Sequence, residues 1–167
     1  MRMSDFYRKS EFDRSYNLGL QSGRNGDFIT AISYFKKAIE IHSEQAGVYY
    51  DLAYSYSRIN QDNVAIAYYK RCVELDDTYS KAFYNLGLVY RRRGDNKSAI
   101  TFFLRTIGLE PNADSAYYNL GNTYLDEGQF KKAIDCFENA ISLNPNHNNA
   151  RNNLRIAKVK NAFNFFR

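Results

Sequence analysis

Amide side chains recur along the chain at a constant spacing of 34 residues. The series is Asn17, Asp51, Asn85, Asn119 and Asn153, with one aspartate among four asparagines. An asparagine offers both a hydrogen-bond donor and an acceptor, which suits the C=O and N–H groups of another polypeptide. Helices that pack about 10 Å apart would present one amide to roughly every third residue of an extended chain. The spacing predicts a surface that binds main chain and tolerates many sequences.

Residues that could catalyse a reaction or bind a metal do not cluster. His42 and His147 are far apart and fall between repeated blocks, where they are expected to be ordinary loop residues. Cys72 occupies a column of small residues and is expected to be buried, and Cys136 lies two repeats away, too far for a zinc or redox pair. The chain contains no Walker motif, G-x-S-x-G elbow or H-E-x-x-H. We therefore expect no enzyme, no cofactor and no metal site.

The elements that position the amides follow the same period. The 34-residue columns comprise a leucine series, an alanine series, an aromatic series and a small-residue series: Leu18, Leu52, Leu86, Leu120 and Leu154; Ala31, Ala65, Ala99 and Ala133; Phe35, Tyr69, Phe103 and Phe137; Gly19, Ala53, Gly87 and Gly121. The blocks are 12–45, 46–79, 80–113 and 114–147, preceded by an N-terminal segment at 1–11 and followed by a capping helix and tail at 148–167.

The pattern of apolar residues within each block predicts two amphipathic helices joined by a turn. In the third block, Phe83, Leu86 and Tyr90 have the spacing of one helical face, and the Gly94–Asp95 pair then breaks the pattern. A small residue on one helix allows an aromatic side chain of the other to lie against its backbone. A single helix pair buries too little surface to be stable alone, so neighbouring pairs must stack.

Two stretches of the last block carry a family resemblance. The segments 117–124 (YYNLGNTY) and 130–134 (FKKAI) resemble the tetratricopeptide repeat (TPR), a helix–turn–helix unit of 34 residues. The resemblance implies an all-α, right-handed superhelical solenoid whose first helices line a concave groove. It also implies a protein–protein interaction module, so that the amide series would face an extended peptide of a partner. Alternatively, asparagine at this position is part of the average sequence of the repeat and has no role in ligand binding.

Two further columns of the first helices are candidates for the same groove. Tyrosines precede the amides and mostly apolar residues follow them by one turn: Tyr16, Tyr50, Tyr84 and Tyr118; Tyr54, Leu88 and Asn122. Tyrosine supplies contact area at low entropic cost, as binding surfaces require. Tyr54 and Leu88 would form an apolar floor, whereas Asp51 would repel an acidic ligand. The alternative is that the tyrosines pack against neighbouring first helices.

Basic residues recur near the ends of the expected first helices. They are Arg24, Arg58, Arg91 and Arg92, together with Lys81 in the first turn of the third block. Arginine binds carboxylates in a bidentate manner, so these residues predict a rim that attracts an acidic peptide or a terminal carboxylate. The alternative role is compensation of the helix dipole at helix C-termini.

The last helix ends in apolar residues. Ile156, Val159 and Phe163 recur at three- and four-residue steps, and Phe165 and Phe166 follow. An ordinary cap is polar on its outer side. The pattern favours a tail folded back on the last repeat, self-association into a homo-oligomer, or contact with a partner.

Composition excludes several classes of protein. The 167 residues are 44% hydrophobic and 16% aromatic, with only 2 prolines and 9 glycines, which favours a helical chain with a buried core. The sequence contains no run of about 18 apolar residues and no secretory h-region near its start, so we expect a cytoplasmic protein without membrane insertion. A net charge of +5 is modest, and Asp51 and Asp126 interrupt the groove, which makes single-stranded nucleic acid the weaker alternative ligand.

Overall fold

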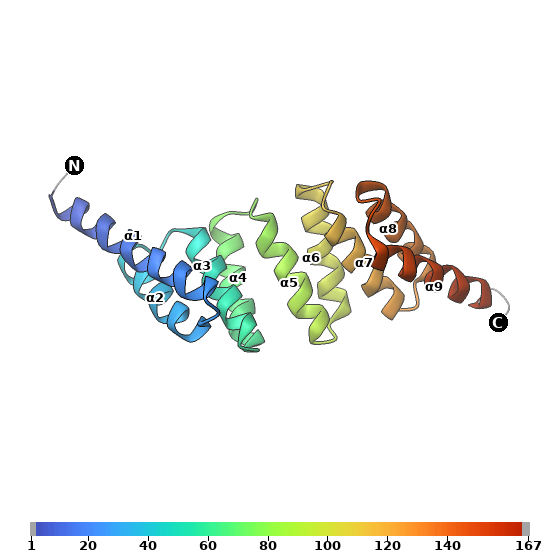
Figure 1. The fold of residues 1–167 in the computed structure, drawn as a ribbon, viewed down its shortest axis with the longest axis horizontal. Helices are drawn as coiled ribbons and strands as arrows, with labels where there is room; N and C mark the ends of the chain where they lie inside the picture. The colour runs from blue at the N-terminus through green and yellow to red at the C-terminus, as the bar shows by residue number, and fades with distance from the viewer. Residues whose placement is uncertain (1–2, 165–167) are drawn as a thin grey trace. The chain divides into compact units, whose positions relative to one another are not determined.

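The computed structural model describes residues 3–164, and side chains from residue 7 to 163, as an array of α-helices (Figure 1). In that part of the chain there are nine helices and no strands. Their bounds are α1 (Met3–Arg24), α2 (Phe28–Ile41), α3 (Ala46–Arg58), α4 (Asp62–Leu75), α5 (Ser80–Arg92), α6 (Asn96–Leu109), α7 (Asp114–Asp126), α8 (Phe130–Leu143) and α9 (Asn148–Asn164). We call α1, α3, α5, α7 and α9 the first helices and the others the second helices. The all-α fold class predicted from the sequence is confirmed.

The turn between the helices of a pair has the same backbone form each time. Gly26, Gly94 and Gly128 have φ of +80°, +78° and +70°, and Asn60 takes the equivalent place with φ of +60°. Asparagine is one of the few residues that adopts this left-handed conformation, which explains why the glycine is replaceable there. Where Asp27 follows the turn, its carboxylate caps the next helix by accepting from the backbone N–H of Thr30 at 3.0 Å.

The N-terminal segment extends the first helix. Because α1 begins at Met3, it has 22 residues, whereas α3, α5 and α7 have 13 each. The sequence alone left open whether this segment continues the helix, and the structure resolves the question for residues 3–11.

The chain forms two compact units, residues 1–82 and residues 83–167, which are described separately. In the first unit, α1 packs on α2, α2 on α3 and α3 on α4, and the first helices α1 and α3 also touch. In the second unit, α6 packs on α7, α7 on α8 and α8 on α9, and the first helices α7 and α9 touch. In each unit, side chains of successive first helices can therefore reach one another.

Aromatic side chains packed on glycines form the core of the helix pairs. Phe35, Phe103 and Phe137 are at most 2% exposed. A Cβ atom on Gly87 would lie 2.6 Å from Cε1 of Phe103, and one on Gly121 would lie 2.7 Å from the same atom of Phe137. Such distances are far inside van der Waals contact, so only glycine permits this approach. The close packing of aromatic on small residue predicted from the columns is confirmed.

Both cysteines belong to the core. Cys72 is fully buried, as its column predicts, and Cys136 is 8% exposed. Burial raises the pKa of each thiol to about 12. Because the thiolate is the reactive form, both cysteines are inert packing groups at neutral pH.

Candidate functional site

In the first unit, a tyrosine–carboxylate hydrogen bond joins two first helices. The hydroxyl of Tyr16 on α1 donates to Oδ2 of Asp51 on α3 at 2.7 Å. Burial raises the pKa of Asp51, although the hydrogen bond from Tyr16 and the positive charge of Lys81 act in the opposite direction. Burial also raises the pKa of neighbouring Tyr79 to about 12. The carboxylate of Asp51 therefore already accepts one hydrogen bond from within the protein, through Oδ2.

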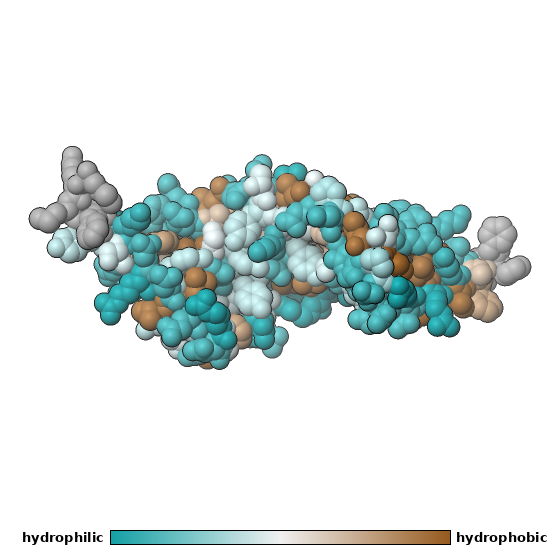
Figure 2. Space-filling model, turned by 45° about the horizontal axis from the view of Figure 1, so that its top comes forward, coloured by the Kyte–Doolittle hydropathy of each residue, from teal (hydrophilic) through white to brown (hydrophobic). Residues whose placement is uncertain are grey.

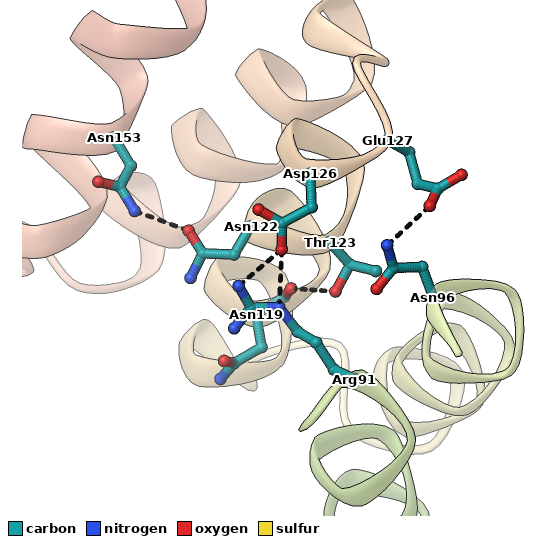
Figure 3. A network of polar contacts seen from close by, with 8 residues as sticks. All are labelled: Arg91, Asn96, Asn119, Asn122, Thr123, Asp126, Glu127 and Asn153. Carbon is teal, nitrogen blue, oxygen red and sulfur yellow. Dashed lines mark hydrogen bonds and ion pairs between the residues drawn. The ribbon is translucent and has the colours of Figure 1, made fainter. Parts of the chain in front are cut away.

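In the second unit, an amide makes the corresponding link in the opposite direction. Nδ2 of Asn119 on α7 donates to the hydroxyl of Tyr84 on α5 at 3.0 Å and to the carbonyl of Ser115 at 2.9 Å. Further along, Nδ2 of Asn153 on α9 donates to Oδ1 of Asn122 on α7 at 2.6 Å (Figure 3). The two links join α5 to α7 and α7 to α9.

These bonds correct one part of the amide hypothesis. The sequence predicts that each asparagine offers a donor and an acceptor to a ligand, but Asn119 uses both of its amide protons inside the protein. Its Oδ1 accepts no hydrogen bond from the described residues, so Asn119 can offer an acceptor only. Asn17 is exposed, and Asn85 and Asn153 are half-buried. Ligand contact by any of them stays a prediction.

The tyrosine column packs on the second helix of its own pair. The ring centroids lie 5.9 Å apart for Tyr16 and Phe35, and 5.8 Å for Tyr50 and Tyr69. The other two pairs have the same geometry, with 6.0 Å for Tyr84 and Phe103 and 6.1 Å for Tyr118 and Phe137. These tyrosines were expected to face a ligand or a neighbouring first helix. Their rings complete the aromatic core of the pair, and two hydroxyls, those of Tyr16 and Tyr84, reach the next first helix, as the second expectation has it. Ligand contact by these half-buried tyrosines stays a prediction.

Leu88 of the predicted apolar floor and Arg91 and Arg92 of the predicted basic rim meet in an open cleft of the second unit. Leu88, Arg91 and Arg92 of α5 and Asp126 of α7 line about 290 Å³. Nη2 of Arg91 lies 2.8 Å from Oδ2 of Asp126, and Nε lies 3.3 Å from the same oxygen (Figure 3). The cleft thus combines the apolar side chain of Leu88 with two arginines, and Arg91 is paired with Asp126.

The rim residues of the first unit are placed differently. Nη1 of Arg58 donates to the hydroxyl of Tyr54 at 2.9 Å, and the guanidinium lies 4.7 Å from the ring centroid of Phe28. Tyr54 is 37% exposed, while Arg24 and Lys81 are exposed. Because Arg58 stacks on aromatic rings, it contributes to packing as well as to charge.

Sequence reasoning missed the partners that join neighbouring repeats. Asp126 was regarded only as an interruption of the groove, yet it pairs with Arg91. Nδ2 of Asn96 donates to Oε1 of Glu127 at 2.7 Å, a second polar link in the same region (Figure 3). Three links join residues 35 apart, one period plus one: Tyr16–Asp51, Tyr84–Asn119 and Arg91–Asp126. A search for complementary residues at that separation would have found them.

The last helix presents a second cleft. Asn152, Arg155, Ile156, Val159 and Lys160 line an open space of about 500 Å³. Ile156, Val159 and Phe163 are 46%, 55% and 72% exposed, so these three side chains are not folded back onto the last repeat. Phe165 and Phe166 lie outside the described residues.

No helix among the described residues is both long and apolar enough to cross a membrane. Within the same residues, histidine, cysteine, aspartate and glutamate form no group of three or more that could hold a metal ion.

Solved structures similar to this chain are repeat proteins. A crystal structure of the MamA protein has 28% identity and a TM-score of 0.87, over 92% of this chain and 84% of that one. YrrB, described as a TPR protein with an unusual peptide-binding site, has 25% identity and a TM-score of 0.76, over 83% of this chain and 71% of its own. MamA from Desulfovibrio magneticus RS-1, at 20% identity and a TM-score of 0.86 over 91% and 86% of the two chains, shows the fold alone. No curated protein matches significantly.

Family models cover most of the sequence. Models described as tetratricopeptide repeat match residues 14–44, 46–79, 68–101 and 115–147, and one described as TPR repeat matches residues 87–126. The helix pairs and the aromatic side chains packed on glycines indicate the same repeat as these family matches. The chain belongs to the tetratricopeptide-repeat family, whose members serve as protein–protein interaction scaffolds.

Proposed function

We propose that this chain is a non-catalytic scaffold that binds an extended segment of a partner protein along the first helices of residues 83–163. Three of these helices repeat one arrangement of side chains at i, i+3 and i+7: Asn85, Leu88 and Arg92 on α5; Asn119, Asn122 and Asp126 on α7; Asn153, Ile156 and Lys160 on α9. Residues at these separations share one face of a helix. Each helix thus offers an amide at one level and a charge about two turns away.

The observation that carries the proposal is the cleft of Leu88, Arg91, Arg92 and Asp126. An apolar side chain of the ligand would rest on Leu88, and a ligand carboxylate would share Arg91 with Asp126. Asn119 lies two helical turns from Asp126 on α7, and its unused Oδ1 would accept a main-chain N–H. The arrangement favours a short extended peptide with one apolar and one acidic residue.

Similarity to YrrB supports this assignment. That protein is described as having an unusual peptide-binding site, and it shares 25% identity with this chain. Asn119 already donates two hydrogen bonds within the protein, so it can only accept one from the main chain of a ligand. Asn153 already donates one hydrogen bond, to Asn122, which leaves its second amide proton and its Oδ1 for a ligand. We therefore place the apolar and ionic contacts of the cleft ahead of the amides as the source of affinity.

The experiment begins with peptides selected on the full chain from a random linear library. Fluorescence anisotropy then gives their affinities for wild type, Leu88→Ala and Arg91→Ala. We expect each variant to weaken binding about 5- to 100-fold, because each removes one ligand contact worth about 1–3 kcal/mol. Ile29→Ala and Arg93→Ala are matched controls, since Ile29 is 74% exposed on α2 and Arg93 is exposed but does not line the cleft.

The outcome that contradicts the proposal is equally specific. Selected peptides that bind Leu88→Ala and Arg91→Ala like wild type would contradict the proposal, because the cleft would then make no contact with the ligand. Circular dichroism melts of the variants identify any loss that comes from unfolding. Leu88 is half-buried, so its variant needs this check most.

A further inference from the structure

The last helix carries an apolar stripe that the described residues leave exposed. Ile156, Val159 and Phe163, here called the α9 seam, follow the i, i+3, i+7 pattern of one helical face. Their exposed fractions are 46%, 55% and 72%. Apolar surface appears at this end of the molecule, near the grey C-terminal residues (Figure 2). Three large apolar side chains in a row on one exposed helix are typical of an interaction surface.

The position of Arg155 explains why α9 differs from the other first helices. On α5 and α7, the residue after the column leucine is Gly87 or Gly121, and a phenylalanine of the second helix lies directly on it. On α9, the residue after Leu154 is Arg155. Alanine is tolerated at this place on α3, where Ala53 and Tyr69 are both fully buried, but the much larger arginine side chain excludes an aromatic side chain seated in that way. A helix that packs on α9 must therefore use another geometry.

The charged residues of α9 itself are all positive. Residues 148–164 contain Arg151, Arg155, Lys158 and Lys160 and no acidic residue. Lys158 pairs with Glu138 of α8 at 2.9 Å, and Arg151 donates to the carbonyl of Pro145. Arg155 and Lys160 line the cleft beside Ile156 and Val159, and Nζ of Lys160 also lies 6.0 Å from the ring centroid of Phe130. A binding partner must supply apolar side chains for the seam and negative charge for its two borders.

We propose that the α9 seam docks an acidic amphipathic helix of a partner protein. The spacing of the seam matches the apolar ridge of such a helix, and glutamates on either side of that ridge would face Arg155 and Lys160. A second copy of this chain fits less well, because two α9 helices would bring like charges together. Ile156 and Lys160 also belong to the helix face described under the proposed function, but none of the residues that line the peptide cleft at Leu88 and Arg91 lines the cleft of the α9 seam.

The probes are two synthetic peptides of three heptads, with leucine at positions a and d and either glutamate or lysine at positions e and g. Fluorescence anisotropy measures their binding to the full chain. We expect the acidic peptide to bind wild type at least about tenfold more tightly than the basic one. The double variant Ile156→Ser/Val159→Ser should lose at least about tenfold in affinity for the acidic peptide.

Charge reversal provides the sharper test. The double variant Arg155→Glu/Lys160→Glu should prefer the basic peptide to the acidic one, a rescue that a merely destabilised protein would not show. Leu104→Ser and Lys97→Glu are the controls, because both residues are exposed on α6 and neither lines the α9 cleft. Both controls should bind the acidic peptide like wild type.

Four results would overturn the inference. The first is equal binding of the two peptides by wild type, and the second is unchanged binding of the acidic peptide by Ile156→Ser/Val159→Ser. The third is binding to phosphatidylserine vesicles that depends on the same residues and exceeds peptide binding. The fourth is a wild-type dimer that Ile156→Ser/Val159→Ser abolishes. The last two would assign the seam to a membrane surface or to a second copy. Sedimentation with vesicles and light scattering over a concentration series measure them.

Discussion

The two units of this chain join their first helices through the same tyrosine column with opposite hydrogen-bond polarity. In residues 1–82, the hydroxyl of Tyr16 donates to the carboxylate of Asp51. In residues 83–167, the hydroxyl of Tyr84 accepts from the amide of Asn119. A phenolic hydroxyl can do either, so the residue one period and one position later decides the direction. The comparison shows that equal positions in a repeat do not imply equal electrostatics.

Of the two link residues, Asp51 and Asn119, only Asp51 has a charge whose desolvation costs free energy on folding. Burial raises the pKa of Asp51, which means that its ionised form is less favourable in the folded protein than in water. Asn119 has no charge to desolvate. The repeat thus keeps the geometry of the link in both units, but one link depends on pH and the other does not.

The cores of the two units should respond alike, and this is the largest effect that we predict. Leu52 in the first unit and Leu86 in the second are both 0% exposed in the same column. Leu52→Ala and Leu86→Ala should each lower the free energy of unfolding by about 2–5 kcal/mol through lost burial and a residual cavity. Urea denaturation measures both values. A loss in one variant alone would show that the units differ in their cores as well as in their polar links.

Exchanging the two link residues should exchange their properties. In Asn119→Asp, the carboxylate can accept from Tyr84, but the donor to Ser115 is lost and a charge is partly buried. We expect a loss of about 1–3 kcal/mol at neutral pH. Asn17→Asp is the matched control: Asn17 belongs to the same column but is exposed, so its change should stay within about 0.5 kcal/mol. An equal effect in both variants would contradict the role given to the link.

Asp51→Asn should act in the opposite sense. Between the ordinary pKa of an unfolded aspartate and the raised pKa of Asp51, the folded state binds more protons than the unfolded state, so stability falls as pH rises through that window. Asparagine removes this dependence and can still accept from Tyr16. At pH 7 we expect a gain smaller than about 1.5 kcal/mol. Thermal melts from pH 3 to pH 7 measure it, and a loss of stability at pH 7 would refute the desolvation argument.

The repeat period predicted the fold and the core correctly, because columns of equal size class report directly on packing. Gly87 and Phe103 are an example: a small and an aromatic residue recur together, and the structure places one on the other. The positive φ of Asn60 was likewise readable from its place in the glycine column. Such features depend on steric fit within one helix pair, which the period of the sequence records.

Polar side chains were less predictable. The amide of Asn119 and the carboxylate of Asp126 each find a partner on the preceding first helix, 35 residues earlier in the sequence. Columns spaced by 34 residues do not display that separation. Exposed polar groups satisfy their hydrogen bonds with whatever lies in reach, including water. The sequence could therefore place Asn119 on the correct helix face but could not tell whether its donors face a ligand or Tyr84.

The rim arginines of the two units give the smallest expected effect. Arg91 forms an ion pair with Asp126, and the two side chains are 33% and 49% exposed, whereas Arg58 stacks on Phe28. Arg91→Ala should cost about 0.2–1 kcal/mol in low salt and nearly nothing in about 1 M NaCl, where the screening length falls to about 3 Å. Arg58→Ala removes apolar contact as well, so its loss should persist in high salt. Urea denaturation of both variants at two salt concentrations, with Arg93→Ala as the control for net charge, measures the difference. If both losses vanish equally in salt, Arg58 acts as a charge alone, and the contrast between a stacked rim in one unit and an ion-paired rim in the other is wrong.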